Sequence, residues 1–481
     1  MVSENTNGKK LVIEPVTRVE GHGKVTIQMD ENNNVTQARL HIVEFRGFER
    51  FVQGRPFWEI PVLVQRLCGI CPVSHHLAAA KAMDRIVGGE NLTPTAEKMR
   101  RLMHYGQTFQ SHALHFFHLC SPDLLFGFDS DPLKRNVIGV AAEYPDLAVQ
   151  GVMMRKYGQE IIKATAGKKI HGTGAIPGGV NKNLSIAERD EFLKDIDQML
   201  EWSRGALKIA RDYTVDNVET AAPFGSFDSN HMGIIGPNNE LDLYDGNYRA
   251  MDAEGNMIFD QVDPQNYTDY LTEEVRSWSY MKFPFINSVG PENGWYRVGP
   301  LARINVSDSI DTPEANEALA EFRSVLGRPC NVTLGYHWAR MIETLHSAEK
   351  IRDLLNDPDL QGDDLVTTGE RRHETVGTIE APRGTLIHHY EVDDNDQVTM
   401  ANLIVSTTHN TEPMNRAVEK VAQDHISGVA EVTEGLLNHV EVAIRAYDPC
   451  LSCATHALGK MPLEVKLLDS DGNVVSEGST L

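Results

Sequence analysis

Four cysteines form two Cys-x-x-Cys pairs that lie far apart in the 481-residue chain. Cys68 and Cys71 make the first pair, and Cys450 and Cys453 make the second. A spacing of two residues lets both sulfurs of a pair bind one ion or bridge two adjacent ions. Four thiolates select soft or borderline metals such as zinc, iron or nickel. The cysteines therefore predict one metal site made of four sulfurs.

The separation of the two pairs along the sequence helps to distinguish a structural metal site from a functional one. A zinc ribbon usually brings its pairs within roughly 15–20 residues of each other, because the ion staples one small unit. Here most of the chain lies between Cys71 and Cys450. Only a fold that already joins both segments can present four sulfurs to one centre. A four-cysteine zinc site in a non-catalytic scaffold stays open as the alternative.

The segments around the cysteines indicate how they are held. Pro72 suits the first position of a helix, and the stretch VSHHLAAAKAMDRIV after it is rich in helix formers. The first pair is therefore expected at a helix N-terminus, where the dipole and free amides favour thiolates. Asp448 and Pro449 are expected to end the last long helix just before the second pair.

Apolar periodicity predicts more helix than strand. Residues 10–47 alternate apolar and polar positions around DENNN, which is typical of a short antiparallel β unit. Residues 222–275 are rich in Asp, Asn and Gly and are expected to form a surface insertion with short strands. Long helices are expected at about 95–120, 136–165, 186–215, 312–356 and 413–446. The predicted fold class is α+β and predominantly α, one domain over residues 1–456 with a helical bundle core and peripheral β units.

Composition excludes several classes of function. The chain has 45 basic and 68 acidic side chains, a formal net charge of −23 and no block of Lys and Arg, so nucleic acid and anionic lipid are not expected partners. No apolar run approaches the ~20 residues that cross a bilayer, and MVSENTNGKK lacks a signal-peptide core. Few cysteines, mostly in close pairs, fit metal chemistry in a reducing compartment. We therefore expect a cytoplasmic protein.

Five motifs, in a fixed order, resemble the large subunit of nickel-iron hydrogenases. The first family signature, R-x-C-G-x-C-x-x-x-H, runs from Arg66 to His75, and the last, D-P-C-x-x-C-x-x-H, runs from Asp448 to His456. The other three are RVEGHGK at 18–24, EFRGFE at 44–49 and EAPRGTL at 380–386. Longer stretches such as EFRGFERFVQGRPFWE are most similar to the cytoplasmic, NAD(P)-linked bidirectional group. The resemblance implies a hydrogenase large-subunit fold over almost the whole chain.

The resemblance also implies the ligands of the metals. Cys68 and Cys450 would be terminal ligands of nickel, and Cys71 and Cys453 would bridge nickel to an iron that carries carbon monoxide and two cyanide ligands. Hydrogen would be split heterolytically at this centre. Electron-rich thiolates suit nickel to that reaction, and the diatomic ligands keep iron redox-quiet.

The resemblance implies that two residues take part in proton transfer. Glu20 would accept a proton from the terminal ligand Cys450, since a carboxylate suits a relay. Arg383 would stand above the metals as a fixed charge or as the base itself, with Asp448 as its partner. Taken alone, Glu20 would be a surface or capping glutamate, and Arg383 would be half of an ordinary buried ion pair.

Further side chains are assigned around the iron and beside it. Arg383, Thr407 and the backbone at Pro382 are expected to form the pocket for the cyanide ligands. His75 is expected to donate a hydrogen bond to a bridging sulfur. His76, its neighbour, has no assigned role.

A magnesium site and a processing site are implied as well. Glu49, the backbone carbonyl of Leu403 and His456 would bind a structural magnesium ion, although an imidazole is not a typical ligand of so hard a cation. An endopeptidase would cut after His456 once nickel is inserted. Residues 457–481 are therefore expected to be a C-terminal propeptide.

Some residues depart from the family pattern. Ser111 stands where many membrane-bound members carry an aspartate near Arg383. Cys120 and Cys330 are unpaired in sequence and are expected to be buried apolar thiols.

The chain has to obtain its electron acceptors from partners. It has no further Cys cluster for iron–sulfur centres and no nucleotide-binding fingerprint. The expected partners are a small subunit with iron–sulfur clusters, diaphorase subunits with FMN that reduce NAD(P), and, during maturation, an endopeptidase and nickel-insertion chaperones. Complexes that reduce ferredoxin together with NAD, or a disulfide reductase, stay open as alternatives. The quinone-site subunit of respiratory complex I shares this fold by descent but lacks the four cysteines.

Overall fold

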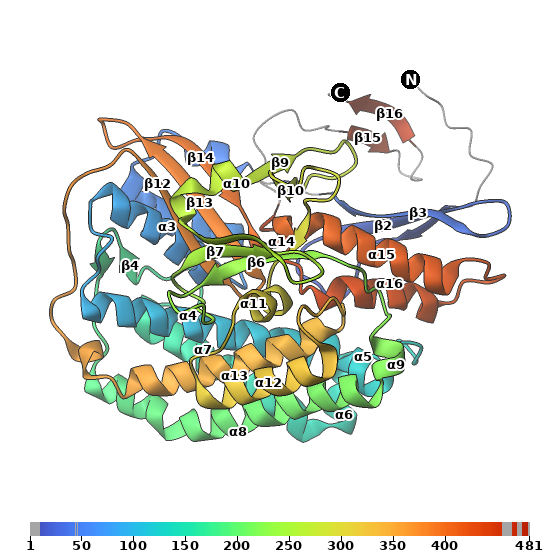
Figure 1. The fold of residues 1–481 in the computed structure, drawn as a ribbon, viewed down its shortest axis with the longest axis horizontal. Helices are drawn as coiled ribbons and strands as arrows, with labels where there is room; N and C mark the ends of the chain where they lie inside the picture. The colour runs from blue at the N-terminus through green and yellow to red at the C-terminus, as the bar shows by residue number, and fades with distance from the viewer. Residues whose placement is uncertain (1–9, 44, 46, 455–463, 469–473, 480–481) are drawn as a thin grey trace.

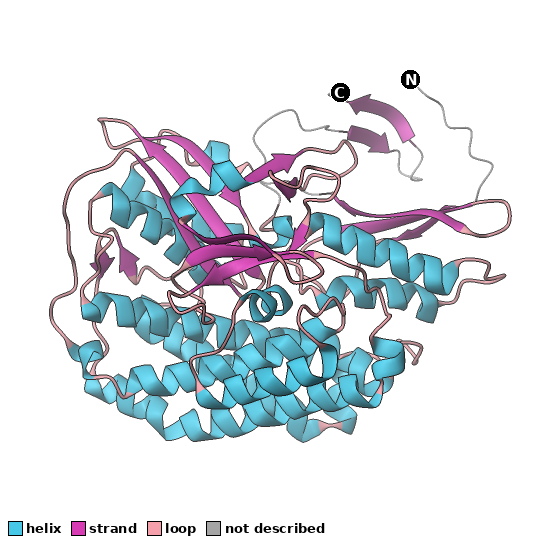
Figure 2. Ribbon diagram, in the orientation of Figure 1, coloured by secondary structure: helices cyan, strands magenta, loops and turns pink. Residues whose placement is uncertain are grey.

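A layer of helices fills one side of the computed structural model of this chain, and the sheets, with further helices packed on them, form the other side (Figures 1 and 2). The structure describes residues 10–43, 45, 47–454, 464–468 and 474–479. The helical layer is a bundle of α4 (Pro94–Leu114), α7 (Pro145–Ala166), α8 (Ile186–Asp216), α12 (Pro313–Leu326) and α13 (Gly335–Leu355). In this bundle α4 packs on α7 and α13, and α13 packs on α8 and α12. The predicted helical bundle is therefore present.

The first segment of the chain is an antiparallel sheet of three strands. It comprises β1 (Lys10–Ile13), β2 (Gly23–Met29) and β3 (Val35–Ile42), in the order β1-β2-β3. Residues 30–34 close the β2–β3 hairpin through a hydrogen bond from the Asp30 amide to the Asn34 carbonyl, 2.9 Å. The β unit expected at 10–47 is confirmed, and it packs against α15 (Thr411–Ile426).

A second antiparallel sheet lies inside the molecule. It consists of β12 (Glu374–Ala381), β13 (Gly384–Val392) and β14 (Val398–Ile404), and β12 packs on α3 (Pro72–Ile86). Nearly every residue of β12 and β13 is buried. The expectation of purely peripheral β units is therefore wrong, because this sheet has helix on one face and other strands on the other.

The region 222–275 also differs from its prediction. Its strands β6 (Asn230–Ile235) and β7 (Asn247–Met251) join β8 (Met257–Val262) and β11 (Tyr296–Arg297) in a four-stranded sheet. Met232, Ile234 and Tyr248 are at most 1% exposed. Most of the Asp, Asn and Gly residues lie outside the strands, whereas β6 and β7 themselves lie in the core. The prediction of short strands was right, and that of a surface insertion was wrong.

Three of the predicted long helices are divided in two. Gly327 and Pro329 separate α12 from α13, and Gly428 lies between α15 and α16 (Glu434–Ala446). Pro145 begins α7 after the short α6 (Val137–Glu143). Each break falls at a residue that cannot continue a helix without cost. The helix predicted at 95–120 is α4 followed by a π-helical turn over His115–Cys120.

The remaining elements are short. The helices are α1 (Phe48–Phe51), α2 (Ile60–Leu63), α5 (Ser121–Phe126), α9 (Val218–Ala221), α10 (Tyr267–Tyr270), α11 (Pro300–Val306) and α14 (Ser406–His409). The strands are β4 (Ala175–Ile176), β5 (Gly179–Val180), β9 (Leu271–Glu274), β10 (Phe283–Ile286), β15 (Glu464–Leu468) and β16 (Val474–Ser479). Among the described residues, no helix has the length and apolar character that crossing a membrane requires.

Candidate metal centre

The four cysteines of the two pairs meet at one point inside the molecule. The Sγ atoms of Cys68 and Cys450 are 3.3 Å apart, those of Cys71 and Cys453 are 3.8 Å apart, and those of Cys450 and Cys453 are 2.7 Å apart. All four side chains are buried and none forms a disulfide. The prediction of one site with four sulfurs, built from both segments, is confirmed.

Local backbone structure sets the first pair at a helix start. Cys71 is the N-cap of α3 and Pro72 is its first residue, as predicted. The amides of Ile70 and Cys71 each lie 3.2 Å from the Cys68 sulfur and donate to it. The second pair follows α16, which ends at Ala446, and Asp448 then adopts a left-handed φ of 53°. Both turns therefore direct their sulfurs to the same point.

The electrostatics of the cluster suit a cation. Burial opposes ionisation of Cys68, but hydrogen bonds from the other three cysteines and the charge of Arg383 hold its pKa well below the ordinary value. Burial and the neighbouring sulfurs raise the pKa of Cys450 well above it, and burial with the sulfurs of Cys68 and Cys71 does the same for Cys453. The thiols of Cys450 and Cys453 therefore lose their protons only when a positive ion compensates the negative charge of the thiolates. A soft, fully buried donor set of this kind fits nickel and iron.

Glu20 lies against the second pair, as predicted. The Cys450 thiol donates to Oε2 of Glu20 at 3.0 Å, and the Ser452 amide donates to the same oxygen at 3.1 Å. The backbones pair as well, since the Leu451 amide donates to the Glu20 carbonyl at 3.0 Å. Gly21 has a φ of +83°, and a Cβ there would lie 2.7 Å from the Ser452 amide nitrogen. Only glycine permits this close approach.

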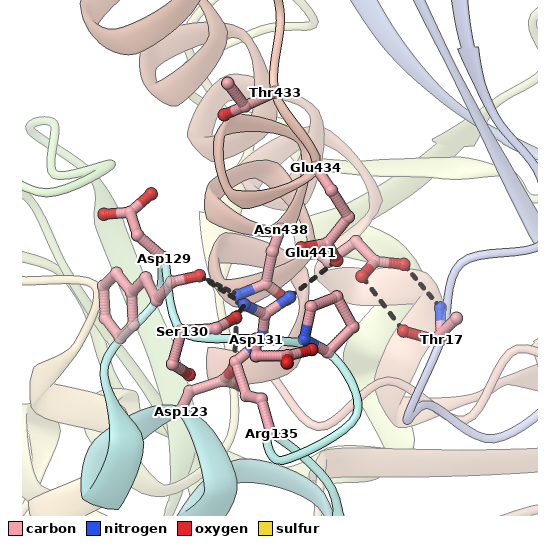
Figure 3. A network of polar contacts seen from close by, with 12 residues as sticks. Thr17, Asp123, Asp129, Ser130, Asp131, Arg135, Thr433, Glu434, Asn438 and Glu441 are labelled. Atoms are coloured by element: carbon pink, nitrogen blue, oxygen red, sulfur yellow. Dashed lines mark hydrogen bonds and ion pairs between the residues drawn. The ribbon is translucent and has the colours of Figure 1, made fainter.

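Buried charges fix the segment that carries Glu20. Figure 3 shows Glu441 of α16 turned toward Thr17, and its carboxylate accepts the Thr17 amide at 2.7 Å and the Thr17 hydroxyl at 3.0 Å. Arg445, one turn later, donates to Glu441 at 2.5 Å and to Asp123 at 2.9 Å. Arg18 also pairs with Asp123, at 2.6 Å. Sequence reasoning missed these residues, although the spacing of Glu441 and Arg445 by four in a helix was a usable signal.

Arg383 lies in the two-residue turn between β12 and β13. Its Nη2 donates to Oδ1 of Asp448 at 3.0 Å, and its Nη1 donates to the Ser111 hydroxyl at 3.3 Å. Burial alone would lower the pKa of Arg383, but Asp448 and the cysteines raise it well above the ordinary value. The guanidinium is therefore a fixed positive charge beside the sulfurs.

A small cavity adjoins the sulfurs. Cys71, Ser74, His75, Ala381, Pro382, Arg383, Leu386, Val405, Ser406, Thr407, Cys450 and Cys453 line it. It brings together the predicted pocket of Pro382, Arg383 and Thr407. The Thr407 hydroxyl accepts the Cys450 amide at 2.9 Å, which leaves its own hydrogen free to be donated.

Ser74 is a lining residue that the sequence analysis overlooked. Its buried hydroxyl has no hydrogen-bond partner in the described part of the chain. It lies three residues after Cys71 on α3, so helical spacing could have identified it.

His75 also lines the cavity, with a partner behind it. Its Nδ1 lies 3.2 Å from Nε2 of His388, whose Nδ1 lies 2.7 Å from the Tyr390 hydroxyl. The hydrogen bond expected from His75 to a bridging sulfur stays a prediction. His76 instead binds the Pro61 carbonyl and the Ala175 amide, so it belongs to the core.

Glu49 lies beside Leu403, at the position expected for magnesium. Its carboxylate is 1% exposed and accepts the Leu403 amide at 2.8 Å. The Nζ atom of Lys282 lies 3.9 Å from Oε1 of Glu49. His456 lies outside the described residues, so the magnesium site and the cut after His456 stay predictions.

A buried network of ion pairs fixes the backbone of the Pro382–Arg383 turn. Arg303 of α11 donates to the Ala381 carbonyl at 2.8 Å and to the Pro382 carbonyl at 3.3 Å. Two carboxylates, Glu343 and Glu380, pair with it at 2.5 Å and 2.8 Å. All three charged side chains are fully buried. The position of the turn thus depends on Arg303 keeping its partners.

The substitution Glu343→Gln is expected to destabilise the protein by about 3–5 kcal/mol, because it leaves a buried arginine partly uncompensated. Burial opposes ionisation of Glu343, but Arg303 and His112 lower its pKa to about 2. This stabilisation is complete above the unfolded pKa near ~4.3 and is lost as the pH falls toward the folded pKa. Thermal unfolding at several pH values checks it. Glu317→Gln, at an exposed position of α12, is the control, and an equal loss in both variants would contradict the prediction.

Models of two protein families match the chain. A model of nickel-dependent hydrogenases matches residues 46–126 and 238–456. A model described as HoxL-like matches residues 10–45. The matched ranges contain both cysteine pairs and the Glu20 motif.

Individual relatives agree with the family models over nearly full length. The chain is 50% identical to the NAD-reducing hydrogenase HoxS subunit beta of Cupriavidus necator, over 98% of this chain and 99% of that protein. It is 43% identical to one chain of the F420-non-reducing hydrogenase of Methanothermobacter thermautotrophicus, over 97% of this chain and 99% of that protein.

Solved structures agree as well. A chain in a crystal structure of an NAD+-reducing [NiFe]-hydrogenase in the H2-reduced state is 56% identical, with a TM-score of 0.91 over 93% of this chain and 99% of that chain. The Ni-Fe-Se hydrogenase of D. vulgaris Hildenborough, at 23% identity and a TM-score of 0.77 over 94% of this chain and 100% of that chain, shares the fold. The chain therefore belongs to the large-subunit family of nickel-dependent hydrogenases.

Proposed function

We propose that this chain is the hydrogen-activating subunit of a cytoplasmic complex that reversibly couples H2 to NAD(P). The observation that carries the proposal is the cluster of four buried cysteines with a carboxylate hydrogen-bonded to one of them. A nickel-iron centre, when bound there, supplies heterolytic cleavage of H2. Cys68 and Cys450 would be its terminal sulfurs, and Cys71 and Cys453 would be its bridging sulfurs.

Cys450 and Glu20 would transfer the proton that the reaction releases. Their S···O distance of 3.0 Å lets a proton pass directly from sulfur to carboxylate. The Ser452 amide holds the same carboxylate oxygen in place. Arg383, kept charged by Asp448, adds a fixed positive charge above the sulfurs.

Cavity residues would receive the diatomic ligands of the iron. Cyanide nitrogen accepts hydrogen bonds, and Arg383 and Thr407 each have donor hydrogens at the cavity wall. The Pro382 backbone lies beside them. Ser74, with its unsatisfied hydroxyl, is added to this set.

Glu49 and Leu403 would hold magnesium together with His456. Processing after His456 by an endopeptidase, and nickel insertion by chaperones, would complete maturation. These assignments rest on the resemblance and on the contact between Glu49 and the Leu403 backbone.

Electrons would leave through partner chains. Apart from the two pairs, the chain has only Cys120 and Cys330, so iron–sulfur clusters and FMN would belong to a small subunit and to diaphorase subunits. NAD(P) is preferred as the final acceptor because the relative at 50% identity is named an NAD-reducing hydrogenase.

The test uses the purified complex. Infrared bands of iron-bound carbon monoxide and cyanide that shift under H2, together with H2-driven reduction of NAD+ or NADP+, are the expected results. Absence of these bands from fully processed protein that contains zinc would overturn the proposal in favour of a scaffold. If the infrared bands are present but neither nucleotide is reduced, only the proposal that NAD(P) is the electron acceptor would be overturned. Ferredoxin would then be assayed as the acceptor.

A further inference from the structure

A second group of metal-binding side chains lies in the core, apart from the four cysteines. His115, Cys120 and His337 each offer one ligand atom, and these atoms all lie within 4.8 Å of one another. The three side chains are 1%, 1% and 3% exposed. Neither the family models nor the proposed reaction gives this group a role.

The π-helical turn explains why His115 and Cys120 meet. In an α-helix, residues five apart point about 140° away from each other around the axis. His115–Cys120 is a π-helical turn, in which hydrogen bonds join residues five apart. The wider turn brings the first and last side chains to the same side. Such turns occur often at functional sites.

His337 completes the group from another helix. It is near the start of α13, and its ring lies nearly parallel to that of His115, with centroids 5.6 Å apart and an interplanar angle of 17°. Its Nδ1 is buried and has no hydrogen-bond partner among the described residues. A buried nitrogen without a partner is costly unless something binds it.

The hydrogen bond of His115 leaves a lone pair on its other ring nitrogen. Its Nε2 lies 2.7 Å from the Arg445 carbonyl, which can only accept, so Nε2 carries the hydrogen. Nδ1 is therefore unprotonated, and it too is buried without a partner in the described part of the chain. Burial and then Arg340 lower the pKa of both histidines, that of His337 to about 3. Neutral imidazoles are the form that binds metals.

We propose that His115, Cys120 and His337 bind one monovalent copper ion in trigonal coordination. A soft thiolate with two imidazoles is a donor set that suits copper, and three ligands suit Cu+ better than Zn2+, which usually takes four. The ion displaces the thiol proton of Cys120, which the thiol now donates to the Phe116 carbonyl at 3.5 Å. One proton is released to solvent per ion bound, and no electron is transferred.

Charge in the surroundings selects a monovalent ion. Arg340 is buried nearby and donates to the Tyr336 and Ala446 carbonyls, which do not cancel its charge. The nearby carboxylates Asp123 and Asp448 are already paired with arginines. A copper(I) thiolate is neutral, whereas a zinc thiolate would add a positive charge beside Arg340. Desolvation makes that second charge unfavourable.

The test compares variants of the purified, nickel-loaded complex. Each is treated anaerobically with Cu+ as its acetonitrile complex and then washed with a Cu+ chelator, and retained copper is measured by mass spectrometry. The wild type is expected to retain about one ion per chain more than Cys120→Ser. Cys330→Ser, at another buried free cysteine, is the control and should retain as much as the wild type.

Spectroscopy identifies the ligands if Cys120→Ser is poorly folded. X-ray absorption at the copper edge should show one sulfur and two nitrogens in the wild type, and His337→Gln should lose one nitrogen. Equal copper in the wild type and Cys120→Ser, or a copper shell of sulfur alone, would overturn the site. Retention of zinc in place of copper, dependent on Cys120, would overturn the assignment of a monovalent ion. None of these outcomes depends on hydrogenase activity.

Discussion

Replacement of Cys450 by serine is expected to remove nickel and to reduce H2/D+ exchange below detection. The Cys450 sulfur lies 3.3 Å from that of Cys68 and 2.7 Å from that of Cys453, and its thiol donates to Glu20. A hydroxyl is a harder and far weaker ligand for nickel than a thiolate. It would also end the sulfur contact with Glu20. The measurements are nickel per chain and isotope exchange by the purified complex.

Cys330→Ser separates ligand loss from a general loss of stability. Cys330 is buried and free, like Cys450, but it lies outside the sulfur cluster. It is expected to keep nickel and exchange at the wild-type level. Nickel retained in Cys450→Ser with ordinary exchange activity would show that the sulfur cluster is not the catalytic centre.

The substitution Glu20→Gln is expected to keep nickel while it slows H2/D+ exchange by about 10²–10⁴-fold, the usual contribution of a positioned acid–base group. Glutamine preserves the shape and can still accept the Ser452 amide, but it cannot take a proton from Cys450. Infrared bands of the metal ligands should be nearly unchanged. The loss should therefore appear in the rate and not in metal content.

A second glutamate in the same segment provides the comparison. Glu14 is exposed and pairs with Lys24, and Glu14→Gln is expected to leave exchange unchanged. If Glu20→Gln exchanged at the wild-type rate with full nickel, the proton would have to leave by another group, and Arg383 would be the first to replace.

Much of the site could be predicted because its chemistry is local in sequence. Each cysteine pair lies within four residues, and the helix N-terminus at Pro72 is encoded by the proline itself. The contact of Glu20 with Cys450 was predictable only through the resemblance, since no local pattern relates residues so far apart. The same holds for Arg383 and Asp448.

Other features could not be predicted, because they depend on burial between layers. The turns of 222–275 are polar, which concealed strands such as β6 that are buried in the core. The role of Glu441 and Arg445 depends on Thr17 reaching them from the start of the chain. The π-helical turn at His115–Cys120 has no signature in a sequence that suits an ordinary helix.

The pairing of Glu20 with Cys450 also sets a minimum time during synthesis. The two residues are 430 positions apart, so at about 5–20 residues per second the ribosome makes the second roughly 20–90 s after the first. Through that interval Glu20 exists without its partner, and the Cys68 pair does so from its own synthesis onward. The catalytic centre therefore cannot be assembled as the chain emerges, and its metals must arrive before or while the late segment closes over them.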